Sequence, residues 1–421
     1  MTPRLSAAMA LGSALAACAP GGSVAPPAPI CPGAPCLLDP LKALLDSAVA
    51  AGAAPGAVLA VSSHGQRFVY ATGRLALDDP TRPDARTVYD LASLTKVVAT
   101  TTLAMLAVSE GRLDPDAPMQ RYLPEFRGAS KEGVTIRHLL THSSGLRADR
   151  PLWRETPNAD SALRLVNATP LDTFPGVRMV YSDLGAIVLG EVIERIYHDR
   201  LDRLARRRIF APLGMMSTRF RPPTSWLPRV APTEYDTGWR KRIVRGEVHD
   251  EKAAWLGGVA GHAGLFGSAE DLMTFGEWLL RETQGCKDAA VTQRPKGATT
   301  QSGRPSTVPC VIASLRPSVV QEFTRRQNLV PGSSRALGWD TPSPNSSAGT
   351  RLDSTSFGHT GFTGTSIWMD PTRELAIVLL TNRVHPTRNN PRIGPLRIAV
   401  ADRVVTLLGN GAAARGAPPR R

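Results

Sequence analysis

The chain has 421 residues, of which 42% are hydrophobic and 20% are charged, so it can bury a substantial core and is not a disordered protein. After the N-terminus it has no apolar run of about 18 residues, which excludes a polytopic membrane protein. Lys and Arg number 50 against 36 Asp and Glu, a formal net charge of +14. No zinc-finger spacing, RNP-like aromatic motif or leucine-zipper heptad accompanies this charge, so we expect no nucleic-acid partner. A solvated basic surface accounts for the excess, with attraction to an anionic polymer or membrane as the alternative.

The first residues are typical of an exported protein. Arg4 precedes an apolar stretch of small residues up to Ala17, so residues 1–17 are predicted to be a signal peptide. They end in Leu15-Ala16-Ala17-Cys18, which resembles a bacterial lipobox and implies that Cys18 is acylated. Ala19 resembles the residue found in lipoproteins sent to the outer membrane. We therefore expect a periplasmic protein with a lipid anchor and a Pro- and Gly-rich tether over residues 18–37.

Four cysteines remain after Cys18. An even number in an exported chain favours disulfides, and proximity pairs Cys31 with Cys36 and Cys286 with Cys310. The second bridge would close a polar stretch, residues 283–312, that is typical of an insertion loop.

Hydrophobic periodicity predicts the elements in chain order. Helices are expected over 38–51, from Ser93 to about Glu110, through much of the chain to Leu204, over 269–282, and from about Arg392 to Leu408. Strands are expected over 57–63, 66–72, 356–361, 365–370 and 375–382. Strands at both chain ends with helices between them indicate an α/β (α+β) fold, in which the two ends build one antiparallel sheet flanked by helices, beside an all-helical region. The predicted domain spans residues 38–409, followed by a basic, disordered tail over 410–421.

The chemistry is predicted to centre on Ser93-Leu94-Thr95-Lys96 at the start of a helix. Three residues are about one helical turn, so the two polar side chains lie on one face within hydrogen-bonding reach. A serine hydroxyl cannot attack a carbonyl unaided, but a neighbouring amine that is neutral near pH 7 can take its proton. The helix N-terminus adds amide groups and a positive dipole end where an oxyanion forms.

Two further motifs follow in the chain. Tyr181-Ser182-Asp183 stands where a loop opens into an apolar helix, and His359-Thr360-Gly361 lies on a C-terminal strand. We expect Gly361 to leave room for a substrate backbone beside the strand edge.

The order of these motifs resembles that of the serine β-lactamase and penicillin-binding protein superfamily, in particular its class C-like branch. The resemblance covers about residues 38–409 and includes flanking stretches at Tyr89–Ala92, Thr135–Leu146 and Phe210–Met215. It implies that Ser93 is the acylated nucleophile, Lys96 its proton partner and Tyr181 the second member of the proton relay. It also implies an oxyanion hole formed by the amides of Ser93 and Phe362.

The sequence departs from the family pattern at two positions. Asp183 stands where the family usually has Asn, and His359 stands where many members have Lys, with Thr360 and Gly361 completing that motif. A carboxylate near Lys96 favours its charged form and opposes a neutral-lysine mechanism unless Tyr181 is the base. A histidine removes a permanent cation for a substrate carboxylate.

Other residues narrow the substrate class. The stretch Gly246–Phe266, GEVHDEKAAWLGGVAGHAGLF, and the stretch Thr381–Arg388, TNRVHPTR, resemble cell-wall enzymes akin to penicillin-binding protein 4B and muropeptide amidases. In the first stretch, Gly258, Gly261 and Gly264 suggest backbone pressed close to another segment.

Two groups of residues could supply metal ligands, but neither has a complete set. They are the pair His138 and His142 and the group His249, Asp250 and His262. We expect no metal and no cofactor.

The sequence thus predicts a serine hydrolase that forms an acyl-enzyme and cleaves peptidoglycan stem peptides or muropeptides as a D,D-carboxypeptidase or amidase, with β-lactams as further ligands. The alternative is a class C-like esterase or β-lactamase. A further alternative, from Asp183 and His359, is a non-catalytic lipoprotein that binds penicillin or peptidoglycan.

Overall fold

The computed structural model describes residues 36–128, 130–285, 315–344 and 346–416, without the side chains of residues 410–416. The predictions for the signal peptide, for Cys18, Cys31, Cys286 and Cys310, and for most of the insertion loop fall outside these residues. Cys36 is disulfide-bonded, and its pairing with Cys31 stays a prediction. Within the described part of the chain, no helix is both long and apolar enough to cross a membrane.

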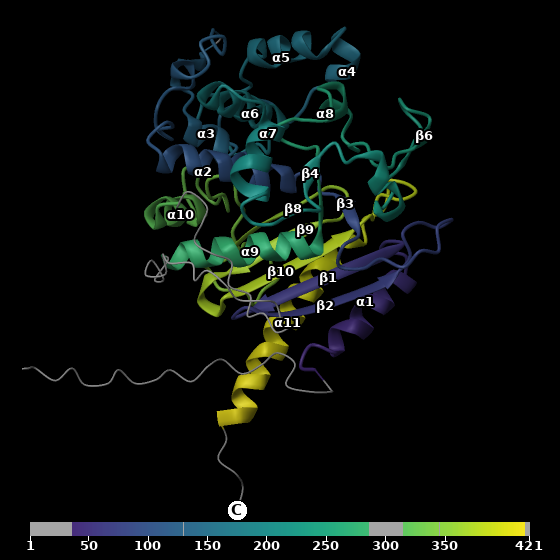
Figure 1. The fold of residues 1–421 in the computed structure, drawn as a ribbon. Helices are drawn as coiled ribbons and strands as arrows, with labels where there is room; N and C mark the ends of the chain where they lie inside the picture. Colours follow the sequence, from purple (N-terminus) through teal and green to yellow (C-terminus); the bar gives the residue numbers. More distant parts are fainter. Residues whose placement is uncertain (1–35, 129, 286–314, 345, 417–421) are drawn as a thin grey trace, which may run out of the picture.

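A five-stranded sheet joins the two ends of the chain (Figure 1). Its strand order is β2-β1-β10-β9-β8 and every neighbouring pair is antiparallel. The strands are β1 (Gly56–Ser63), β2 (Gln66–Gly73), β8 (Phe357–Thr360), β9 (Ser366–Asp370) and β10 (Leu375–Thr381). The predicted fold class, with both chain ends in one sheet, is confirmed.

Local sequence explains the first hairpin and the two buried faces of the sheet. His64 and Gly65 both have positive φ, 49° and 75°, as a two-residue turn between antiparallel strands requires. Alternate residues of β1 then belong to opposite cores: Val58 and Ala60 to one, Leu59 and Val61 to the other. This follows from the two-residue period of a strand.

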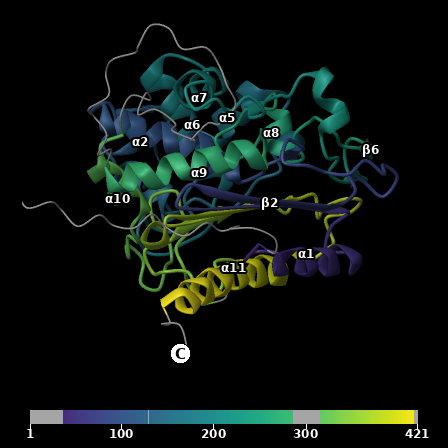
Figure 2. The ribbon, with the colours of Figure 1, turned by 60° about the horizontal axis from the view of Figure 1, so that its bottom comes forward.

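Helices cover both faces of this sheet (Figure 2). On one face lie α1 (Pro40–Ala50) and α11 (Ile393–Gly416), which pack Leu41, Leu45 and Val404 against the sheet. On the other lies α9 (Ala269–Gln284), whose Gly276 would bring a Cβ to 3.2 Å from Ala376 of β10. The sheet is therefore buried on both sides.

The last helix is longer than predicted. α11 continues to Gly416, so the prediction of a disordered tail from residue 410 is wrong for residues 410–416. The segment reads Asn-Gly-Ala-Ala-Ala-Arg-Gly, and its three consecutive alanines have the highest helix propensity. Residues 417–421 lie outside the described residues.

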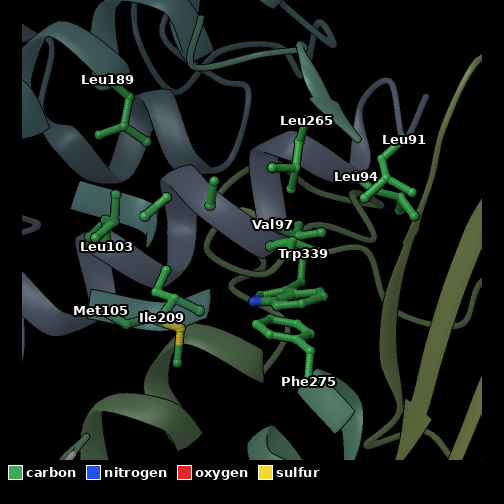
Figure 3. Close-up of a cluster of buried hydrophobic side chains, with 14 of the residues drawn as sticks. Leu91, Leu94, Val97, Leu103, Met105, Leu189, Ile209, Leu265, Phe275 and Trp339 are labelled. Atoms are coloured by element: carbon green, nitrogen blue, oxygen red, sulfur yellow. The ribbon is translucent and has the colours of Figure 1, made fainter. Parts of the chain in front are cut away.

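The middle of the chain builds the helical region above α9. Its main elements are a π-helical segment η1 (Lys96–Thr101), α2 (Thr102–Ser109), α3 (Ile136–Leu140), α4 (Leu152–Glu155), α5 (Ala159–Ala168), α6 (Asp183–Tyr197), α7 (Leu201–Ala205), a second π-helical segment η4 (Arg206–Phe210), α8 (Glu251–Trp255) and α10 (Pro317–Thr324). Short 3-10 turns η2 (Met119–Arg121), η3 (Lys131–Gly133), η5 (Thr224–Arg229) and η6 (Pro371–Arg373) connect other parts of the chain. Figure 3 shows the core around the segment after Ser93, where Leu94, Val97 and Leu103 are buried.

Two small sheets were not predicted. One has the order β3-β7-β4, with β3 (Val88–Asp90), β7 (Leu265–Ser268) and β4 (Arg219–Phe220), and the other pairs β5 (Tyr235–Asp236) with β6 (Arg242–Ile243). Strands of two to four residues are too short to show a two-residue period. The first of these sheets matters for the site, because it places the turn before Ser93 beside the end of the Gly246–Phe266 stretch.

Candidate active site

Ser93 follows β3 in a tight turn. Ala92, the residue before it, has φ of 47°, a left-handed conformation that a non-glycine residue adopts only when its surroundings hold it there. The buried Asp90 carboxylate does so by accepting hydrogen bonds from the amides of Ala92, at 2.8 Å, and His249, at 2.6 Å. The turn therefore carries Ser93 to the wall of a cavity of about 450 Å³.

Lys96 contacts Ser93 directly. Its Nζ donates to Ser93 Oγ at 2.9 Å and to the carbonyl oxygen of His262 at 3.2 Å, and the side chain is 4% exposed. The three-residue spacing on a helical turn predicted this contact from the sequence.

Asp183, the first residue of α6, forms an ion pair with Lys96 at 2.8 Å. Burial acts to lower the pKa of Lys96, but the Asp183 carboxylate and Tyr181 together outweigh it and hold that pKa above its usual value. Burial acts to raise the pKa of Asp183, and the charges of Lys96, His262 and Lys252 outweigh it in turn, so this carboxyl stays ionised. Lys96 in the resting site is therefore an ammonium ion, as expected from the departure at position 183.

Tyr181 lies between Lys96 and two histidines. Its ring centroid is 4.9 Å from Lys96 Nζ, 4.5 Å from the ring of His142 and 5.9 Å from the ring of His359. Ser93 and Tyr181 thus line one cavity, and Lys96 contacts Ser93 beside it. Their roles as nucleophile, proton partner and relay stay predictions.

His359 on β8 is buried and uncharged. Burial, together with the positive charges of Arg335 and Lys96, holds its pKa well below the usual value. Its Nδ1 lies 2.8 Å from the carbonyl oxygen of Thr360, to which only a protonated nitrogen can donate. Nε2 is therefore the unprotonated nitrogen, and it is buried with no hydrogen-bond partner among the described residues. Position 359 supplies no cation to the cavity.

Thr360 and Phe362 both line the cavity, whereas Gly361 serves the packing of the chain itself. A Cβ on Gly361 would lie 2.1 Å from Thr365 Oγ1 and 2.5 Å from the carbonyl oxygen of Leu91. The fold therefore requires a glycine here on steric grounds, and the room that it leaves for a substrate stays a prediction. The adjacent Thr363 hydroxyl donates to the carbonyl oxygen of Asp90 at 2.7 Å, which ties this loop to the Ser93 turn.

The predicted oxyanion hole consists of two main-chain amides. Neither the Ser93 nor the Phe362 amide forms a hydrogen bond within the part of the chain that is described. Phe362 is 50% exposed. Arg383 Nε donates to the carbonyl oxygen of Phe362 at 2.8 Å, and the guanidinium carbon of Arg383 lies 4.4 Å from the centroid of the Phe362 ring. The two amides are available to an oxyanion, and this role stays a prediction.

Arg335 also lines the cavity, although no sequence motif pointed to it. Its guanidinium carbon is 5.2 Å from the centroid of the Tyr181 ring. Its Nε and Nη1 are buried and lack hydrogen-bond partners among the described residues. The sequence carries no signal for this arginine, because its place in the site depends on tertiary packing alone.

A second polar cluster adjoins Lys96. Lys252, on α8, lies within 3.0 to 3.3 Å of the carboxylates of Asp149, Asp183 and Asp250, and His262 Nε2 lies 2.9 Å from Asp250. Gly261 lets this segment approach α6, since a Cβ there would lie 2.0 Å from the carbonyl oxygen of Ala186. The prediction that glycines of the Gly246–Phe266 stretch mark close backbone contact fits this geometry.

The candidate metal ligands are arranged differently from the sequence expectation. His249 pairs with Glu234 at 2.9 Å instead of joining Asp250 and His262, whereas Asp183 joins them, with donor atoms within 4.8 Å of one another. The ammonium groups of Lys96 and Lys252 already balance these carboxylates, so the cluster does not have the open charge that a cation site needs.

The pair His138 and His142 does not come together at a metal either. His138 caps α3 by accepting from the Thr135 amide at 3.1 Å, and His142 Nδ1 accepts from the Ser182 amide at 3.1 Å. Each ring is committed to the backbone of a helix start.

A serine in contact with a buried lysine, beside a tyrosine and on the wall of a cavity, is the arrangement of a serine hydrolase site. The model of the beta-lactamase family matches residues 41–402, and the chain belongs to this family. It is a serine hydrolase of the β-lactamase and DD-peptidase type.

Individual proteins resemble the chain over most of its length. A protein of Salmonella paratyphi B named "Putative D-alanyl-D-alanine carboxypeptidase" is 31% identical over 352 residues, which are 77% of this chain and 76% of that protein. Among solved structures, EstCE1, a hydrolase with promiscuous acyltransferase activity, has a TM-score of 0.66 at 21% identity and covers 88% of this chain and 98% of its own. A class C beta-lactamase has a TM-score of 0.66 at 18% identity, with coverages of 88% and 96%. These two structures share the fold.

Proposed function

We propose that the protein cleaves peptidoglycan stem peptides or muropeptides at an amide bond through an acyl-enzyme on Ser93, as a D,D-carboxypeptidase or amidase. The observation that carries the proposal is the contact of Ser93 Oγ with Lys96 Nζ at 2.9 Å in a cavity that also presents the unpaired Arg335. The similarity to the Salmonella protein supports the peptide class of substrate.

The proton steps start from the charged Lys96. In the reactive form the Lys96–Tyr181 pair has lost one proton, as neutral amine with phenol or as ammonium with phenolate, and these are two forms of one coupled pair. The pair takes the Ser93 proton as Oγ attacks the carbonyl carbon, and the amides of Ser93 and Phe362 hold the oxyanion. The proton then passes to the leaving nitrogen as the amide bond breaks. In the second half of the reaction, water attacks the acyl-enzyme and gives its proton to the same pair. Ser93 Oγ then leaves with that proton, and the carboxylic acid product is released.

The decisive experiment labels the nucleophile. Purified protein is incubated with a fluorescent penicillin and with a fluorophosphonate, and the adduct is located by intact mass and peptide mapping. We expect label on Ser93 and none on Ser93→Ala. Absence of label on wild-type protein whose fold is intact by circular dichroism would refute the acyl-enzyme and leave the non-catalytic binding lipoprotein.

Arg335 indicates the charge of the substrate that we propose. Because His359 is uncharged and the other cations lining the cavity, Lys252 and Arg388, contact carboxylates, Arg335 is the cation of this cavity, within the described residues, that has no acidic partner. A buried, unsatisfied guanidinium is costly, and a substrate carboxylate would satisfy it with paired hydrogen bonds. This favours a peptide that ends in a carboxylate.

Matched substrates test that assignment. A D-Ala-D-Ala peptide and its C-terminal amide differ only in the charge that Arg335 would bind. Arg335→Met is expected to reduce the ratio of their kcat/KM values about 10- to 100-fold, as for the loss of a hydrogen bond to a charged group. An unchanged ratio would contradict the carboxylate subsite.

An esterase or β-lactamase activity is the second candidate. The uncharged His359 favours it, because a neutral ester needs no cation at that position. A turnover panel of nitrocefin, a p-nitrophenyl ester, a D-Ala-D-Ala peptide and a muropeptide ranks the candidates by kcat/KM. Preference for the ester or nitrocefin would replace the peptidase proposal.

A further inference from the structure

Asp183 has two cationic neighbours, one on each oxygen. Oδ1 lies 2.8 Å from Lys96 Nζ and Oδ2 lies 3.3 Å from Lys252 Nζ. Lys252 is 5% exposed and also lies 3.0 Å from Asp149 and 3.0 Å from Asp250. The carboxylate that holds Lys96 is therefore shared with a second buried ammonium.

Because Asp183 is shared, its electrostatic effect on the protonation of Lys96 depends on Lys252. A lone carboxylate at 2.8 Å would strongly favour the ammonium form of Lys96. Lys252 acts in the opposite sense, because its positive charge offsets part of the Asp183 charge. The remaining charged and titratable groups facing this pair are Tyr181, His262, Asp250 and Asp149, with Arg335, His142 and His359 behind the Tyr181 ring.

We propose that Lys252 is a positioning residue that offsets part of the Asp183 charge from the oxygen opposite Lys96, so that Lys96 faces a partly balanced carboxylate. An asparagine at position 183 would present a neutral neighbour without a second lysine. The inference rests on the proposed acylation of Ser93, since the proton leaves the Lys96–Tyr181 pair in that reaction.

The test is the pH dependence of Ser93 acylation in four full-length proteins: wild type, Asp183→Asn, Lys252→Met and the double variant. The second-order rate of fluorophosphonate labelling is followed from about pH 5 to about pH 10, a range that brackets the titration of such a pair. Acylation needs the deprotonated Lys96–Tyr181 pair, so its rate rises through the pKa of the pair. Lys252→Met removes a positive charge and should move the midpoint upward. If the midpoint rises by about one pH unit, the rate at any pH below it falls about 10-fold.

The other variants predict an order of midpoints. Asp183→Asn removes the negative charge and should move the midpoint below that of wild type. The double variant removes both charges and should return close to the wild-type midpoint, which loss of packing alone would not do. Asp149→Asn is the matched control: it removes a 57% exposed carboxylate that contacts Lys252 but not Lys96, and the midpoint should move far less than in Asp183→Asn, because solvent screens this charge.

Two results would overturn the proposal: a midpoint unmoved in folded Lys252→Met, or a double variant whose midpoint lies as high as that of Lys252→Met. Should Lys252→Met not fold by circular dichroism, the comparison is made in the Asp183→Asn background. There Lys252→Met should raise the midpoint only to that of wild type, and Lys252→Arg should leave it low. A wild-type protein that is not labelled at any pH refutes the acyl-enzyme itself, and the role of Lys252 falls with it.

Discussion

In the proposed mechanism Ser93 and Lys96 work as one unit, because the ammonium that contacts the hydroxyl belongs to the pair that receives its proton. We expect Lys96→Ala to slow fluorophosphonate labelling of Ser93 by about 1,000-fold or more, since removing one member of a coupled nucleophile loses nearly the whole effect. The rate of labelling at mildly alkaline pH measures it. Near-normal acylation by folded Lys96→Ala would remove the lysine from the mechanism.

The buried histidines predict a pH-dependent stability. Burial and neighbouring cations lower the pKa of His142 and His359 well below the usual value. Below about pH 6.5 the unfolded chain therefore binds protons that the folded chain does not, and stability is lost as pH falls. Each histidine contributes up to about 1.4 kcal/mol per pH unit in that range.

His142→Asn isolates this effect, because an asparagine oxygen can still accept from the Ser182 amide. Its unfolding free energy should fall less steeply between about pH 6.5 and about pH 5 than that of wild type, as measured by urea denaturation. Glu191 and Asp271, whose pKa values burial raises to about 7 and to about 6, act in the opposite direction. They are common to both proteins, so the difference in slope is the diagnostic, and equal slopes would contradict a neutral His142.

At the scale of elements, the turn from β3 to Ser93 depends on Asp90. Asp90→Ala would leave the amides of Ala92 and His249 buried without their acceptor. We expect a loss of about 2–4 kcal/mol in unfolding free energy and slower labelling of Ser93, because the left-handed Ala92 would relax. Thermal and urea denaturation measure the first effect. Asp90→Asn, which keeps one acceptor oxygen, should lie between the two proteins, and a stable, fully active Asp90→Ala would contradict the role.

The sequence predicted those elements whose periodicity is long enough to read. All five strands of the large sheet were placed within two residues of their ends, because short apolar runs such as those of β1 and β10 are bounded by turn residues. The helix predicted from Ser93 instead begins as a turn and continues as η1 before α2, a local change of hydrogen bonding that side-chain periodicity does not encode.

The site was predictable only where its residues lie in local motifs. Ser93, Lys96, Tyr181 and His359 come from such motifs. The structure places Ser93, Tyr181 and His359 in the lining of one cavity and Lys96 in contact with Ser93. Arg335 and Lys252 come from segments whose approach depends on the packing of distant elements. In the sequence, Arg335 belongs to no motif, and Lys252 is one charged residue within a glycine-rich stretch. Neither feature indicates which residues these side chains contact in the fold.

For the whole molecule, part of the net charge of +14 lies in two arginine clusters of the described residues. The arginine clusters at 203–208 and 240–245 are largely paired with acids: Arg203 and Arg207 with Asp199, Arg208 with Glu110, Arg240 with Asp236 and Glu247, Arg242 with Glu247, and Arg245 with Asp79. This supports the solvated basic surface over a nucleic-acid site.

Membrane attachment is predicted to depend on one residue, Cys18. Cys18→Ala should move the protein from the membrane fraction to the soluble fraction of the cell envelope, because the acyl chains supply the anchoring free energy. Immunoblots of fractionated cells measure it, with wild type as the reference. Equal membrane association of both proteins would contradict lipidation at this position.

The hydrogen bond from Thr363 to Asp90 joins residues 273 positions apart. The strand that carries His359, β8, is followed in the chain only by β9 and β10 among the described strands. A chain emerging in order from the ribosome or from an export channel therefore has its serine motif long before it has a site. Contacts of such long range form late, and only after nearly the whole chain is present. On the predicted export route, a half-translocated copy would therefore lack a complete site and could not attack acyl donors.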